Sequence, residues 1–90
     1  MAKVKFTSAL RNFFPDLKET EVSGKSVYDV LQELEETYPG ISGYLLEDDG
    51  QLRKHVNIFL KETLVTDRRH LTDTVNKEDE ILIYQALSGG

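Results

Sequence analysis

Residues 26–38 read SVYDVLQELEETY, and this stretch predicts one amphipathic helix. Its apolar side chains recur at i, i+3, i+4, i+7 and i+11, which places them on one face: Val27, Val30, Leu31, Leu34 and Tyr38. Ser26 is the expected N-cap, with Asp29 three residues later in an approximate capping box. Pro39-Gly40 ends the helix. A single apolar helix face needs an apolar sheet face on which to pack.

Alternating polar and apolar residues on both sides of the helix predict that sheet. In chain order the expected strands are Lys3–Thr7 and Glu19–Val22 before the helix, and His55–Leu60, Thr63–Val65 and Ile81–Ala86 after it. Ile41–Leu46 adds a possible helical turn. We expect an α+β fold of the β-grasp type, a mixed four- to five-stranded sheet covered on one face by a single main helix. The last strand should lie parallel to the first in the middle of the sheet.

Composition narrows the classes of function. The 90 residues fit one domain, and 39% hydrophobic with 30% charged residues is typical of a folded chain. A formal net charge of -5 argues against a nucleic-acid partner, because phosphate binding needs clustered Lys and Arg. The two basic clusters, Arg53-Lys54-His55 and Arg68-Arg69-His70, are interpreted as solvated turns. The longest apolar run, Ile81–Tyr84, is too short for a bilayer, so we expect a cytoplasmic protein without a membrane partner.

Conventional active-site patterns are missing from the sequence. It has no cysteine, so no side chain can hold sulfur as a thiol or persulfide. His55 and His70 have no spaced metal partner, which predicts no metal site. The carboxylate runs are expected on solvated helix faces or turns, where nothing suggests the burial that shifts the pKa of a catalytic acid or base: Glu35-Glu36, Asp48-Asp49 and Glu78-Asp79-Glu80. We therefore expect no catalytic residue, no stably bound cofactor and no enzyme activity of its own.

The last two residues, Gly89-Gly90, are the remaining place for chemistry. They follow the apolar stretch Ile81–Leu87 with only Ser88 between. Without Cβ atoms they form a thin thread that can enter a narrow enzyme channel, and nothing branched shields the terminal carbonyl. A carboxylate becomes electrophilic once an activating enzyme has joined it to AMP, and a sulfur donor can then displace the AMP and leave a thiocarboxylate.

Several segments, in order and spacing, resemble the MoaD/ThiS family of ubiquitin-like sulfur carriers over nearly the whole chain. They are residues 26–31, Tyr38-Pro39-Gly40-Ile41, Val56-Asn57-Ile58-Phe59, residues 79–84 and Ala86-Leu87-Ser88-Gly89-Gly90. The resemblance implies a β-grasp domain over 1–87 and an exposed tail over 88–90. It also implies adenylation of Gly90 by a MoeB/ThiF-type enzyme that uses ATP, recognition of the tail at Gly89, Ser88 and Leu87, and sulfur delivery to a biosynthetic enzyme.

The pathway and the acceptor stay open at this stage. Carriers of this kind serve cysteine, molybdopterin, thiamine or thiolated-tRNA synthesis. Gln85–Ser88 replaces the Pro-Pro-containing tail common in molybdopterin synthase small subunits, and Glu47–Phe59 looks more like carriers for cysteine synthesis. One alternative is a ubiquitin-like modifier joined to lysines through Gly90, another is a molybdopterin synthase small subunit, and a third is a β-grasp binding module without C-terminal chemistry.

Strand alternation also predicts a partner surface. Val56, Ile58, Leu60, Ile81 and Ile83 should face the helix, so Phe59, Leu82 and Tyr84, with Ala86, should point away from it. One main helix cannot cover both faces of the sheet. Large apolar residues left together on the outer face predict a docking patch for partner enzymes. The alternative is that Phe13-Phe14 or Ile41–Leu46 folds over and buries them.

Overall fold

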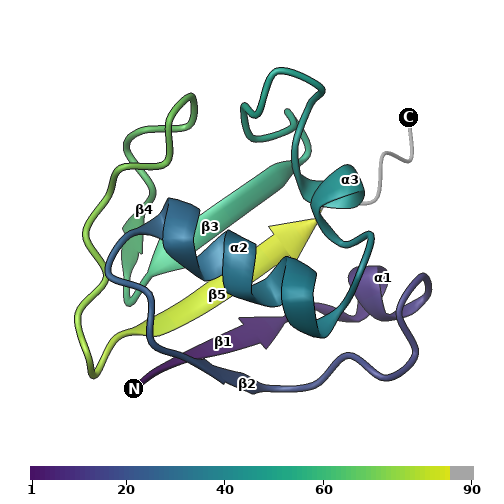
Figure 1. Ribbon diagram of the computed structural model, residues 1–90, viewed down its shortest axis with the longest axis horizontal. Coiled ribbons are helices and arrows are strands. Elements are labelled where there is room, and N and C mark those ends of the chain that lie inside the picture. Colours follow the sequence, from purple (N-terminus) through teal and green to yellow (C-terminus); the bar gives the residue numbers. More distant parts are fainter. Residues whose placement is uncertain (86–90) are drawn as a thin grey trace.

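The computed structural model describes residues 1–85, which form one mixed sheet with a helical layer on one face (Figure 1). The elements in chain order are β1 (Ala2–Phe6), α1 (Ser8–Arg11), β2 (Thr20–Val22), α2 (Val27–Thr37), α3 (Ser42–Leu45), β3 (Val56–Leu60), β4 (Thr63–Leu64) and β5 (Glu80–Gln85). The strand order is β2-β1-β5-β3-β4. β5 pairs parallel with β1 and antiparallel with β3, so the predicted central position of the last strand is confirmed.

The helix α2 forms where its stripe and cap predict it. Val27, Val30, Leu31 and Leu34 are all buried. Its first N–H groups are satisfied from two directions, because Ser26 Oγ accepts from the Asp29 amide at 3.1 Å while a distant loop supplies the other acceptors. The Val27 amide donates to the Asp73 carbonyl and the Tyr28 amide to the Leu71 carbonyl. The loop over residues 66–75 therefore holds the start of α2 in place.

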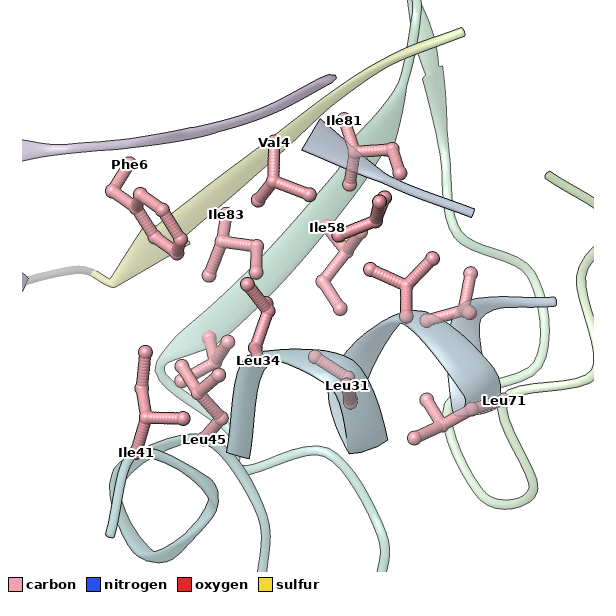
Figure 2. Close-up of a cluster of buried hydrophobic side chains, with 14 of the residues drawn as sticks. Val4, Phe6, Leu31, Leu34, Ile41, Leu45, Ile58, Leu71, Ile81 and Ile83 are labelled. Carbon is pink, nitrogen blue, oxygen red and sulfur yellow. The ribbon is translucent and has the colours of Figure 1, made fainter. Parts of the chain in front are cut away.

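The core lies between α2 and the inner face of the sheet (Figure 2). Side chains that alternate along the strands meet Leu31 and Leu34 of α2 there, and they are Val4, Phe6, Val56, Ile58, Ile81 and Ile83. Ile41, just before α3, and Leu45, its last residue, close one end of this layer. The sequence assigned the inner face of β3 and β5 correctly, with Leu60 only partly buried at its edge.

Three features differ from the expectations. The one-turn helix α1 is not predicted; it forms because Leu10 turns inward and is fully buried. Asp79 is buried at 5% exposure rather than solvated, and its carboxylate accepts from the Asn76 amide at 2.8 Å and faces Lys61 Nζ at 3.6 Å. Arg68 is not a simple surface residue, because its guanidinium bonds to the chain around β3.

Candidate functional site

The predicted attachment point, Gly90, is five residues further along the chain than Gln85, the last described residue of the central strand β5. β5 ends at Gln85, between the end of β1 and the start of β3, where Gln85 is the register partner of Val56. The predicted tail residues lie outside the described residues: Leu87, Ser88, Gly89 and Gly90. The central strand that leads to these residues is paired with β1 on one side and with β3 on the other.

Arg68 holds the start of β3, which lies beside the end of β5. Its guanidinium donates to Asn57 Oδ1 at 2.9 Å, to the Arg53 carbonyl at 2.7 Å and to the Val56 carbonyl at 2.9 Å. These bonds tie the loop over residues 66–75 to the start of β3, and the Leu52 amide donates back to the Arg68 carbonyl. The prediction that Arg68-Arg69-His70 is a solvated turn is wrong for Arg68, because its hydrogen-bond partners lie in a distant part of the sequence.

The outer face of the sheet carries an apolar patch, which we call the outer patch and which consists of Phe59, Leu64, Leu82 and Tyr84. In the sheet register Phe59 lies beside Leu82 on one side and Leu64 on the other. Leu64 and Tyr84 are 45% and 42% exposed, whereas Phe59 and Leu82 are half-buried. The predicted outward direction of Phe59, Leu82 and Tyr84 is confirmed. Leu64 was missed, although the alternation of Thr63–Val65 contains it.

The segments that could have covered this patch pack elsewhere. The ring of Tyr44 lies 4.8 Å from that of Phe13 and 5.3 Å from that of Phe14, measured between centroids. Phe14 packs against the core, and Ile41 and Leu45 are buried within it, on the helix side of the sheet (Figure 2). Neither of these two segments therefore covers the outer patch. An ion pair of 3.3 Å between Lys5 and Glu80 borders it on β1 and β5.

The titratable groups with shifted pKa values accept hydrogen bonds from loop or turn residues, and Glu35 does so from near the end of α2. The Gly40 and Ser42 amides lower the pKa of Glu35, and the Gln51 side chain and amide lower that of Asp49. The Thr72 hydroxyl and the His70 amide lower the pKa of Asp67 to about 2.

Residues 1–85 contain neither a candidate metal site nor a candidate membrane-spanning helix. No group of three or more His, Cys, Asp or Glu side chains there could hold a metal ion. In the same described stretch no helix is long and apolar enough to span a membrane. Among the described residues, the end of β5 and the outer patch are the features that we consider for chemistry and recognition.

Comparison with known proteins places this geometry in a family context. The sequence pattern of the ThiS family matches residues 4–90. The chain is 30% identical to the small archaeal modifier protein 3 of Haloferax volcanii, over 87% of this chain and 94% of that protein. It is 29% identical to the sulfur carrier protein CysO of Mycobacterium tuberculosis, over 97% of this chain and 96% of that protein.

Solved structures agree with the fold. The crystal structure of Mycobacterium tuberculosis CysO aligns with a TM-score of 0.82 at 27% identity, covering 97% of this chain and all of that one. A chain from the Amycolatopsis orientalis BexX/CysO complex aligns with a TM-score of 0.84 over the full length of both chains. At 23% identity this second likeness supports the fold alone. The β-grasp, ubiquitin-like fold expected from the sequence is confirmed.

Proposed function

Since the chain belongs to the ThiS family of ubiquitin-like sulfur carriers, we propose that it carries sulfur as a thiocarboxylate on Gly90. The observation that supports this most is the family match, which runs through the Gly89-Gly90 pair. One of the relatives is named as a modifier and another as a sulfur carrier. The chain is accordingly a protein co-substrate, and the catalysis belongs to its partners.

The proposed chemistry has two steps on the terminal carboxylate. An activating enzyme of the MoeB/ThiF type joins the Gly90 carboxylate to AMP, with pyrophosphate leaving from ATP. A sulfur donor at the oxidation level of hydrosulfide then attacks the same carbonyl; a C–S bond forms as the C–O bond to AMP breaks. Gly89, Ser88 and Leu87 are the residues that the enzyme channel recognises. The absent side chain of Gly89 and the small one of Ser88 let the thread pass.

The outer patch is the surface that we propose both partners bind, the activating enzyme and the sulfur-accepting enzyme. Phe59, Leu82 and Tyr84 lie on β3 and β5, and Tyr84 is next to Gln85, the last described residue of β5. An enzyme that binds this face therefore holds the tail near its own active site. The second partner is a sulfur-accepting biosynthetic enzyme, and the likeness of Glu47–Phe59 to carriers for cysteine synthesis favours that pathway over molybdopterin synthesis.

A second candidate function uses the same activated Gly90 carbonyl but transfers it to a different acceptor. The 30% identity to a small archaeal modifier protein favours conjugation, in which the activated Gly90 carbonyl is joined to lysine side chains of other proteins. Both functions begin with adenylation, so they share the tail and the outer patch. They differ in the product, which is a thiocarboxylate in one case and an isopeptide-linked conjugate in the other.

Intact-mass analysis of the protein purified from its own host distinguishes these functions. We expect a fraction heavier by the difference between one sulfur and one oxygen atom, located in the C-terminal peptide and lost on oxidation. Deletion of Gly90 should abolish this fraction and leave the unfolding midpoint unchanged. Conjugates shifted in size on a gel, without the sulfur-containing fraction, would support the modifier instead. A Gly90-deleted protein that still supports its pathway would contradict both.

A further inference from the structure

Gln85 is a polar residue in a position that the strand pattern assigns to the core. Along β5 the side chains of Ile81 and Ile83 point to the helix side and are buried, and Gln85 is next in the same series. Its register partner across β3 is Val56, which is fully buried. An apolar side chain would match these neighbours. A residue that breaks the local pattern in this way needs a reason other than packing.

The side-chain oxygen of Gln85 lacks a hydrogen-bond partner within residues 1–85. This atom, Oε1, is buried and accepts no hydrogen bond from the residues that the structure describes. A buried polar atom without a partner loses its contact with water and gains nothing in return. The closed position of Gln85 is therefore less stable than it would be with an apolar side chain. The amide regains its hydrogen bonds when the end of β5 moves out into water.

The backbone of Gln85 is also weakly held. The Thr7 amide still donates to the Ile83 carbonyl at 3.3 Å, but the Thr7 carbonyl is occupied by the Leu10 amide in the first turn of α1. The Gln85 amide consequently reaches only the Thr7 hydroxyl, at 3.5 Å, which is the long limit for a hydrogen bond.

The neighbouring strand β3 adds no backbone bond at this rung. Antiparallel pairs alternate between bonded and non-bonded, and Val56 turns both of its groups away from β5. The Val56 amide donates to Arg53, and the Val56 carbonyl accepts from Arg68. Within residues 1–85, Gln85 is thus the point on β5 where side chain and backbone are both poorly anchored, and it is the last residue that the structure describes.

We infer that Gln85 is a positioning residue at which the end of β5 lifts from the sheet when the activating enzyme draws the tail into its channel. This inference rests on the proposed function. The outer patch keeps the protein docked while the strand end lifts, and each freed residue adds about 3.3 Å of reach. The orphaned amide lowers the cost of that movement because water hydrates it in the lifted state.

The variant Gln85→Leu tests the inference, because it fills the same position with an apolar side chain. Hydrogen exchange at the Tyr84 and Gln85 amides should become about tenfold slower, and the thermal midpoint should rise. With the adenylating enzyme of its own host and ATP, the kcat for AMP transfer should fall severalfold while the KM stays unchanged. A side chain with a purely structural role would raise stability without moving kcat.

Two further variants serve as controls. Gln32→Leu makes the same chemical change on the exposed face of α2 and should alter neither exchange at Tyr84 nor kcat. Thr7→Val removes the long bond to the Gln85 amide without touching a helix cap, since the Thr7 side chain makes no capping bond. It should speed exchange at Gln85 and leave kcat no lower than that of the wild-type protein.

The outcomes separate this inference from the proposed function. Wild-type protein that forms no adenylate contradicts the chemistry at Gly90, whereas the exchange measurement still reports on Gln85. Normal adenylation of both wild type and Gln85→Leu overturns the positioning role. Exchange at Tyr84 and Gln85 that is no slower in Gln85→Leu than in wild type also overturns it, because the amide would then not promote opening.

Discussion

At the scale of single residues, Gly24 lies where the chain passes the first turn of α2. A Cβ atom there would lie 2.8 Å from Asp29 Cβ and 2.9 Å from the Val30 amide nitrogen. The same position lets the carboxylate of Glu33 accept from the Ser23 amide at 3.0 Å and the Gly24 amide at 2.6 Å. Glycine at this position is required by close approach, since a side chain would push the loop and the helix apart.

We predict that Gly24→Ala lowers the free energy of unfolding by about 1–3 kcal/mol, the usual cost of forcing extra volume into a packed contact. Urea unfolding measures the change. Gly43→Ala is the matched control, because a Cβ at Gly43 meets no atom within 4 Å and the residue lies inside α3. That variant should be neutral or more stable by up to about 1 kcal/mol. Equal effects of the two variants would contradict the steric argument.

At the scale of elements, the sequence predicted what depends on local pattern. The stripe and Ser26 cap gave α2, and alternation gave the five strands to within about two residues at their ends. It did not predict α1, because four residues without a capping side chain carry no periodic signal and only the burial of Leu10 forms the turn. The buried Asp79 and the bonds of Arg68 were missed because their partners lie on other elements.

The loop over residues 66–75 is an element that the sequence presented only as a polar stretch. Asp67 accepts hydrogen bonds from the Arg69, His70 and Thr72 amides and from the Thr72 hydroxyl. The turn that follows brings Leu71, with a φ of 58°, to the start of α2, where its carbonyl accepts from Tyr28. The charge of Asp67 therefore stabilises a loop that in turn caps the main helix.

We predict a pH dependence from this loop. The pKa of Asp67 is lowered from 3.8 to about 2 in the folded protein. Its contribution to stability is therefore fully present above about pH 4 and is lost as the pH falls through about 2. Urea unfolding at pH 4, 3 and 2 should show a smaller loss of stability in Asp67→Asn than in wild type. Asp48→Asn, in an exposed turn, is the control and should follow the wild-type curve.

At the scale of the whole molecule, the two faces of the sheet have different tasks. The inner face is closed by α2 and α3 (Figure 1), whereas the outer patch has no covering element within residues 1–85. The sequence predicted this division from alternation alone, because a chain with one main helix can cover only one face. Alternation does not distinguish Phe59 from Tyr84 on the outer face. In the structure, however, Phe59 lies between Leu64 and Leu82 and is half-buried.

The outer patch leads to a prediction that separates docking from folding. Tyr84 is 42% exposed, so Tyr84→Ala should lower the free energy of unfolding by less than about 1 kcal/mol. A buried aromatic residue would cost about 3 kcal/mol or more. If the patch docks the activating enzyme, the same variant should weaken binding by about tenfold or more, since exposed aromatics at interfaces carry much of the binding energy. Titration calorimetry measures the affinity.

Tyr28→Ala is the matched control for this prediction, because Tyr28 is 52% exposed on α2, in the layer that covers the other face. It should leave both stability and affinity near wild type. Phe59→Ala should weaken binding as well, with an added loss of stability because its ring packs between two strands. Unchanged affinity in Tyr84→Ala, or an equal loss in Tyr28→Ala, would show that partners do not bind the outer patch. The enzyme would then have to recognise the tail without the sheet.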